Sequence, residues 1–113
     1  MMSENKNLKV IVVNNGKPEY RYIKYKDDDE LLYELQNILG GYIEQVTVSR
    51  SFIILCNEDG RIKGLPYNCS ICGVDFVGPI IVCSSNGEDW TDVVMSIDQF
   101  KRYLCKFGMF IGV

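Results

Sequence analysis

Residues 40–68 read GGYIEQVTVSRSFIILCNEDGRIKGLPYN, and this stretch decides the fold. Two runs rich in β-branched and aromatic residues, 42–48 and 52–56, flank the short polar segment 49–51. That pattern predicts a tight β-hairpin. The Asp-Gly pair at 59–60 predicts a second reversal of the chain. Polar residues at glycine-marked strand ends are typical of binding surfaces and do not form a catalytic motif, so the stretch points to binding.

The segment before this hairpin predicts two further strands. Residues 8–13 are apolar on both faces over most of their length, which places that strand inside a sheet. Asn14-Asn15-Gly16 is a turn signal. Residues 20–25 are more polar and are predicted to lie nearer an edge. Such an edge would offer a pairing surface for an even-numbered homo-oligomer.

A helix is predicted between these strands and the hairpin. Residues 27–30 are Asp-Asp-Asp-Glu, in which one aspartate caps the helix and the others complement its positive end. Gly40 follows as the C-cap glycine. One apolar stripe runs along the helix and consists of Leu31, Leu32, Leu35, Ile38 and Leu39.

The rest of the chain predicts less regular structure. Residues 61–63 predict a short strand, residues 64–74 an irregular loop, and residues 79–83 a strong strand. Ser96-Ile97-Asp98-Gln99 matches a capping box, which predicts the start of a second helix that Gly108 ends. That helix would carry four apolar residues on one face: Ile97, Phe100, Leu104 and Phe107.

These elements predict an α+β domain with a mainly antiparallel sheet of about five strands and two helices packed on one face. At 113 residues the chain is one domain by length, which we place at residues 8–113 behind a flexible polar tail, residues 1–7. The tail lacks the apolar region of a signal peptide, and the longest apolar runs are far too short to span a membrane. We therefore expect a cytoplasmic protein that does not contact membranes.

The composition narrows the classes of function. The chain has no histidine, which removes the commonest general base and the commonest metal ligand. The net charge of −3 leaves no excess of Lys and Arg for direct contact with nucleic acid. We expect neither an enzyme nor a cofactor.

The cysteines predict structural thiols. Cys69-Ser70-Ile71-Cys72 has the spacing of a zinc or redox pair. A closed zinc site needs four ligands, and a thioredoxin-like pair needs a helix start after a βαβ unit, which the pattern lacks. We therefore predict reduced thiols and no metal site. The five cysteines are Cys56, Cys69, Cys72, Cys83 and Cys105.

Five residues form the predicted ligand site. Asn57 and Asn68 offer both a donor and an acceptor, as the edge of a base or an amide requires, although asparagine also simply favours turns. Tyr42 and Tyr67 are amphipathic aromatics that can stack on a base or anchor an interface. Glu44 completes the set, and it would also be an acid/base candidate if Asp75 lay beside it.

The chain resembles a family of small domains of unknown function carried by phages and other mobile elements. The resemblance rests on five segments in order: LKVIVVNNG at 8–16, ELQNILGGYIEQV at 34–46, ILCNEDGRIKGLPYN at 54–68, VGPIIV at 77–82 and VMSIDQFKRYL at 94–104. Its most specific parts are Gly40-Gly41, Asn57-Glu58-Asp59-Gly60 and Leu65-Pro66-Tyr67-Asn68. The resemblance implies a small accessory protein and no particular chemistry.

We therefore hypothesise a non-enzymatic binding protein with a counter-defence role. It would sequester a small nucleotide immune signal, held by Tyr42, Asn57, Tyr67 and Asn68, in a deep polar pocket. Alternatively, it would bind a host defence protein directly, through an aromatic patch and the acidic helix start. The competing class is a small carboxylate-dependent enzyme, whose acids would be Glu44, Glu58, Asp59 and Asp75.

Overall fold

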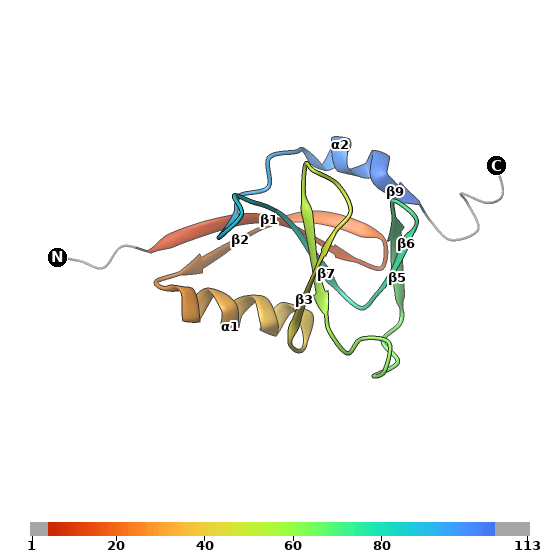
Figure 1. Cartoon of the computed structure of the whole chain (residues 1–113), viewed down its shortest axis with the longest axis horizontal. Coiled ribbons are helices and arrows are strands. Elements are labelled where there is room, and N and C mark those ends of the chain that lie inside the picture. Colours follow the sequence, from red (N-terminus) through yellow and green to blue (C-terminus); the bar gives the residue numbers. More distant parts are fainter. Residues whose placement is uncertain (1–4, 106–113) are drawn as a thin grey trace.

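The computed structural model describes residues 5–105. Their elements, in chain order, are β1 (Lys6–Asn14), β2 (Lys17–Tyr25), α1 (Asp28–Leu39), β3 (Ile43–Thr47), β4 (Ile53–Asn57), β5 (Tyr67–Ile71), β6 (Val74–Val77), β7 (Ile80–Ser85), β8 (Trp90–Thr91), α2 (Ile97–Phe100), the 3₁₀ turn η1 (Lys101–Tyr103) and β9 (Leu104–Cys105). Figure 1 shows their arrangement. β1 starts at Lys6, inside the segment predicted as a tail.

The strands form two antiparallel sheets. The larger has the order β2-β1-β7-β4-β3, with β8 paired to β7, and the smaller has the order β6-β5-β9. The prediction of a mainly antiparallel sheet is confirmed, and β2 lies at an edge as expected, but the predicted single sheet of about five strands is instead a six-stranded and a three-stranded sheet. β7 is central because Ile80, Ile81 and Val82 are fully buried and can only sit where both faces of the sheet are covered.

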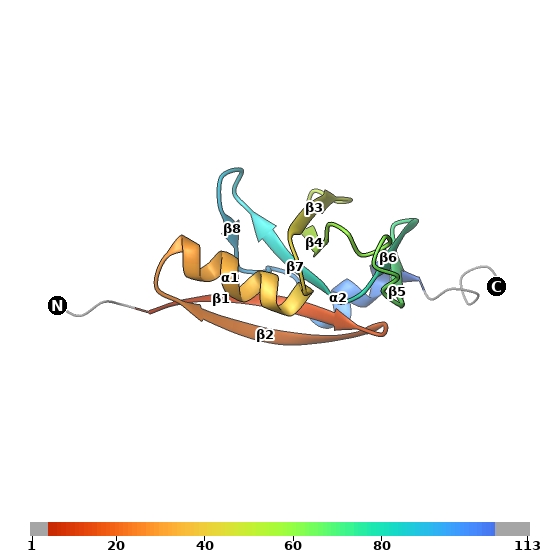
Figure 2. The ribbon, with the colours of Figure 1, turned by 90° about the horizontal axis from the view of Figure 1, so that it is seen from below.

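The two faces of the larger sheet belong to two separate cores. Alternate β1 residues point to opposite faces, so Val10 packs with the leucines of α1 while Ile11 packs in the cluster that contains Phe100 of α2. The prediction that both helices pack on one face is therefore wrong. Figures 1 and 2 show α1 on one side of the β1–β2 ribbon and α2 on the other.

The predicted boundaries of α1 are confirmed. The Asp27 carboxylate accepts a hydrogen bond from the Glu30 backbone N–H at 2.8 Å, and Gly40 adopts a φ of 79°. Its buried stripe is narrower than predicted and consists of Leu31, Leu35 and Leu39. Leu32 is exposed.

The middle of the chain differs from the prediction. Residues 61–63 form a turn instead of a strand, and β5 and the start of β6 occupy the segment predicted to be irregular. The tip of their hairpin is Cys72-Gly73, with φ values of 53° and 83°. This is the left-handed geometry of a two-residue hairpin turn, which Asn-Gly or Asp-Gly usually provides.

The predicted second helix is shorter than expected. The capping box is present, but α2 has four residues and is followed by η1. Leu104 then pairs with Ile71 in the smaller sheet, so the prediction of a helix continuing through Leu104 is wrong. Phe107 and Gly108 lie outside the described residues.

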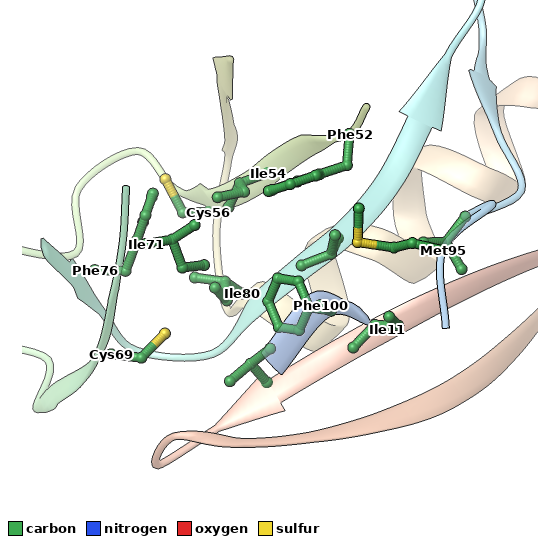
Figure 3. Close-up of a cluster of buried hydrophobic side chains, with 13 residues drawn as sticks. Ile11, Phe52, Ile54, Cys56, Cys69, Ile71, Phe76, Ile80, Met95 and Phe100 are labelled. Carbon is green, nitrogen blue, oxygen red and sulfur yellow. The ribbon is translucent and has the colours of Figure 1, made fainter. Parts of the chain in front are cut away.

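The smaller sheet covers one end of the larger sheet and completes the core that contains Phe100. Figure 3 shows Cys69, Ile71 and Phe76 from the smaller sheet facing Ile54 and Cys56 of β4, with Ile80 between them. Phe52 and Phe100 meet edge to face, with ring centroids 5.9 Å apart. This packing holds β6 opposite the β3–β4 hairpin.

Candidate functional site

A hollow of about 370 Å³ opens between the β3–β4 hairpin and β6, and we call it the β3–β6 hollow. Its apolar lining comes from Val46, Ile62, Val74, Phe76 and Val77. Its polar lining comes from Glu44, Cys56, Asn57, Glu58, Arg61 and Asp75. Ile62 stands in the turn after β4, lines the hollow and is 87% exposed, so it forms an apolar rim.

The charges of the β3–β6 hollow are mainly negative. Glu44, Glu58 and Asp75 contribute carboxylates, and Arg61 contributes the opposing charge among the residues that line it. The Arg61 guanidinium donates a hydrogen bond to the backbone carbonyl of Asp75 at 2.8 Å, which ties the turn to β6. The hollow therefore favours cationic groups and disfavours phosphates.

Cys56 forms part of the floor and is an unreactive thiol. Burial raises its pKa to about 11, the negative charge of Glu44 adds to the rise, and the charge of Arg61 opposes it. Its Sγ lies 3.7 Å from the backbone carbonyl oxygen of Glu44. At neutral pH the thiol is protonated, so it is no nucleophile.

Asn57 reaches the hollow, but its amide is already engaged. Its Nδ2 donates to the Leu39 carbonyl at 3.1 Å, and its Oδ1 accepts from the Asp59 N–H at 2.8 Å. The side chain thus joins the end of α1 to the turn after β4. A Cβ on Gly41 would lie 2.8 Å from Asn57 Nδ2, which explains why a glycine stands at position 41.

Asn68 is also a structural residue and lies outside the β3–β6 hollow. Its Nδ2 donates to the carbonyls of Val13 and Gly78, both at 2.7 Å. Its Oδ1 accepts from the Gly16 N–H at 2.8 Å. One buried amide therefore connects the β1–β2 turn to the link between β6 and β7.

The two predicted tyrosines do not line the hollow either. Tyr42 is 69% exposed beyond the end of α1. The Tyr67 hydroxyl lies 2.6 Å from Ser70 Oγ, and Ser70 Oγ donates to Asp75 Oδ1 at 2.5 Å. This chain of hydrogen bonds orients Asp75 on the β5–β6 hairpin.

The structure thus brings together only part of the predicted set. Glu44 and Asn57 of the predicted ligand site share the hollow, and Glu58 and Asp75 of the predicted enzyme site join them, whereas Asp59 does not line it. Sequence reasoning missed Arg61 and Ile62. An isoleucine in a turn of polar residues was the signal that could have revealed the exposed rim.

The CxxC cysteines do not form a pair in space. Cys69 lies in the core, where burial raises its pKa to about 12, while Cys72 is exposed at the hairpin tip. Within residues 5–105, no group of three or more His, Cys, Asp or Glu side chains is arranged to hold a metal ion. Nor is any helix in that part of the chain long and apolar enough to cross a membrane.

Comparison with known proteins identifies a family and no function. No curated protein matches the chain, and no solved structure matches it. The family described as "Domain of unknown function (DUF3846)" matches residues 8–108, which include every helix and strand described above except the first two residues of β1. The chain belongs to the DUF3846 family of domains of unknown function.

Proposed function

We propose that this chain is a non-enzymatic binding protein whose partner is another protein, held at the β3–β6 hollow. The observation that supports this most strongly is the exposed Ile62 at the rim of a hollow with an apolar floor. A concave, partly apolar surface with an apolar side chain at its rim has the form of a pocket that receives an anchor residue of a partner. In the phage setting that the resemblance implies, the partner would be a host defence protein.

The charges of the hollow favour a protein over a nucleotide. A sequestered nucleotide signal would bring phosphates, which Glu44, Glu58 and Asp75 would repel. Its base would find Asn57 already hydrogen-bonded to Leu39 and Asp59. Of the two counter-defence mechanisms, direct binding of a protein therefore has the better support.

An enzyme has less support than a binding protein. Asp75 accepts a hydrogen bond from Ser70, and the Cys56 thiol is held protonated. A carboxylate-dependent mechanism needs an acid and a base that flank a reacting bond with their pKa values set apart. Glu44, Glu58 and Asp75 share the hollow, but no interaction among the described residues assigns one of them the role of acid and another the role of base.

The proposal is tested with two matched surface variants, Ile62→Asp and Val94→Asp. Both side chains are highly exposed, at 87% and 77%, so neither change should disturb the fold. Only Ile62 lines the β3–β6 hollow. Wild type and both variants are tagged, crosslinked in host cells, captured and analysed by quantitative mass spectrometry.

We expect a specific protein to be captured by wild type and by Val94→Asp but reduced at least tenfold with Ile62→Asp, a loss of about 1.4 kcal/mol. Equal capture by all three proteins would refute a role for the hollow. Native mass spectrometry of the same preparations covers the alternative. A mass increase equal to a nucleotide, lost on denaturation, would replace this proposal with sequestration.

A further inference from the structure

The outer edge of β3 lies open next to the hollow. β3 is the last strand of the larger sheet, and no strand within residues 5–105 pairs with its outer side. An open edge presents backbone N–H and C=O groups that can pair with another extended chain. The edge and the hollow share β3, because the side chains of Glu44 and Val46 line the hollow.

The register of the hairpin shows which backbone groups face outward. The Glu58 N–H donates to the Tyr42 carbonyl, and β3 pairs with β4 from Ile43↔Asn57 onward. In an antiparallel ladder the hydrogen-bonding direction alternates from one residue to the next. The N–H and C=O groups of Ile43, Gln45 and Thr47 therefore point away from β4, toward the open side.

This edge lacks the proline, lysine and bulge that often protect one, and its one charge, Glu44, lines the hollow. The opposite edge of the same sheet, β2, carries Lys17, Pro18 and Lys24, which discourage pairing with another strand. β3 has the sequence IEQVT, with no proline, lysine or bulge. Its edge is therefore competent for strand addition, whereas the β2 edge is guarded.

We propose, as an extension that rests on the proposed function, that the partner docks by adding an extended segment to β3 as a further antiparallel strand. Alternate side chains of that segment would point into the β3–β6 hollow. Main-chain hydrogen bonds would provide affinity and the hollow would provide specificity, as in other strand-addition complexes. The occupant is a basic and apolar strand, because the hollow combines carboxylates with an apolar floor.

The charges and the register define the side chains of this segment. A lysine or arginine opposite Glu44 meets a carboxylate on the same face of the sheet. In the added segment, an aliphatic residue two positions before this lysine or arginine lies opposite Val46. The side chains between them point to the other face, where Gln45 accepts a hydrogen bond from the Trp90 indole at 3.0 Å.

The probe is a fluorescein-labelled heptapeptide, Thr-Ile-Thr-Lys-Thr-Lys-Thr, which places isoleucine opposite Val46 and the first lysine opposite Glu44. In this register the N–H groups of the central two threonines point to β3. One control peptide carries N-methyl groups on those two threonines. The other carries them on the two lysines, whose N–H groups point away from β3. Binding is measured by fluorescence anisotropy with the full chain.

We expect methylation of the threonines to weaken binding by about tenfold or more, and methylation of the lysines by less than about threefold. Glu44→Gln should weaken binding of the unmodified probe severalfold, while Glu19→Gln, an exposed carboxylate on β2, should not change it. Gln45→Pro removes an outward N–H and should abolish binding. The peptide controls keep the test decisive if that variant does not fold.

Equal effects of both methylation patterns, or no binding, would refute strand addition at β3. If Ile62→Asp still reduces capture of the partner while the probe does not bind, the proposed function stands and this docking mode fails. If the chain is a dimer that Gln45→Pro makes monomeric, the edge pairs with a second copy, and the proposed occupant is wrong.

Discussion

Asn68 should be one of the most sensitive polar residues of the fold, and Asn68→Ala tests this. The substitution removes three hydrogen bonds from a side chain that is 5% exposed. At about 1 kcal/mol for each bond, the loss in the free energy of unfolding is about 3 kcal/mol, and unsatisfied buried carbonyls of Val13 and Gly78 would raise it. Such a loss is a large part of the stability of a small domain.

Urea unfolding followed by circular dichroism measures this loss. With an m-value of about 1.5 kcal/mol per molar urea, the midpoint should fall by about 2 M. The control is Asn37→Ala, because Asn37 is exposed on α1 and the change should stay within about 0.5 kcal/mol. A loss below about 1 kcal/mol for Asn68→Ala would refute the structural role and return Asn68 to the ligand site predicted from the sequence.

Asn68→Asp adds a pH test of the same reasoning. The new carboxylate keeps an acceptor for the Gly16 N–H but directs a second oxygen at two carbonyls. The ionised form is therefore disfavoured in the folded state, and the pKa of this carboxyl should rise above its usual value of about 3.9. The variant should lose stability as the pH rises from about 4 through that raised pKa, and the difference from wild type should be larger at pH 7 than at pH 3.5. A difference that does not change with pH would contradict this.

Three further predictions follow from the described geometry. Asn57→Ala should lower the free energy of unfolding by about 2 kcal/mol, measured by urea unfolding, because two hydrogen bonds are lost, one to the end of α1 and one within the turn after β4. Cys72→Asn should raise the melting temperature by a few degrees, since asparagine tolerates a φ of 53° better than cysteine does, and an unchanged melting temperature would argue against strain at the tip. In the native protein at pH 8, a thiol reagent should label the exposed Cys72 rapidly, as peptide mapping would show. The buried thiols have pKa values near 11 to 12, so they remain protonated and should react only on unfolding. The thiols expected to resist are Cys56, Cys69 and Cys83.

The parts of the fold that local signals define were predictable from the sequence. The Asp27 cap, the Gly40 cap and the β3–β4 hairpin each follow from residues within a few positions of one another. The placement of the helices on opposite faces also follows from a pattern in the sequence. Residues 10–13 are apolar on both faces, so each face needs a cover, and two helices on one face would leave the other exposed.

The parts set by contacts distant in the sequence were not predictable in this way. The β5–β6 hairpin was missed because a cysteine, instead of Asn or Asp, stands in its left-handed turn. α2 ends early because Leu104 pairs with Ile71, a contact that no local pattern reveals. The same missed hairpin hid the candidate site, since Glu44 and Asp75 line one hollow only after β6 is placed opposite β3.

The position of β7 has a consequence for how the chain folds during synthesis. β7 pairs with β1 on one side and with β4 on the other, yet it follows both in the sequence. Until Ile80–Ser85 leaves the ribosome, the edges of β1 and β4 that β7 covers in the folded domain have no partner strand. Such edges are prone to aggregation, and the distant pairing that removes them slows folding to about milliseconds to seconds. We therefore expect the nascent chain to need protection by chaperones until its seventh strand emerges and closes the sheet.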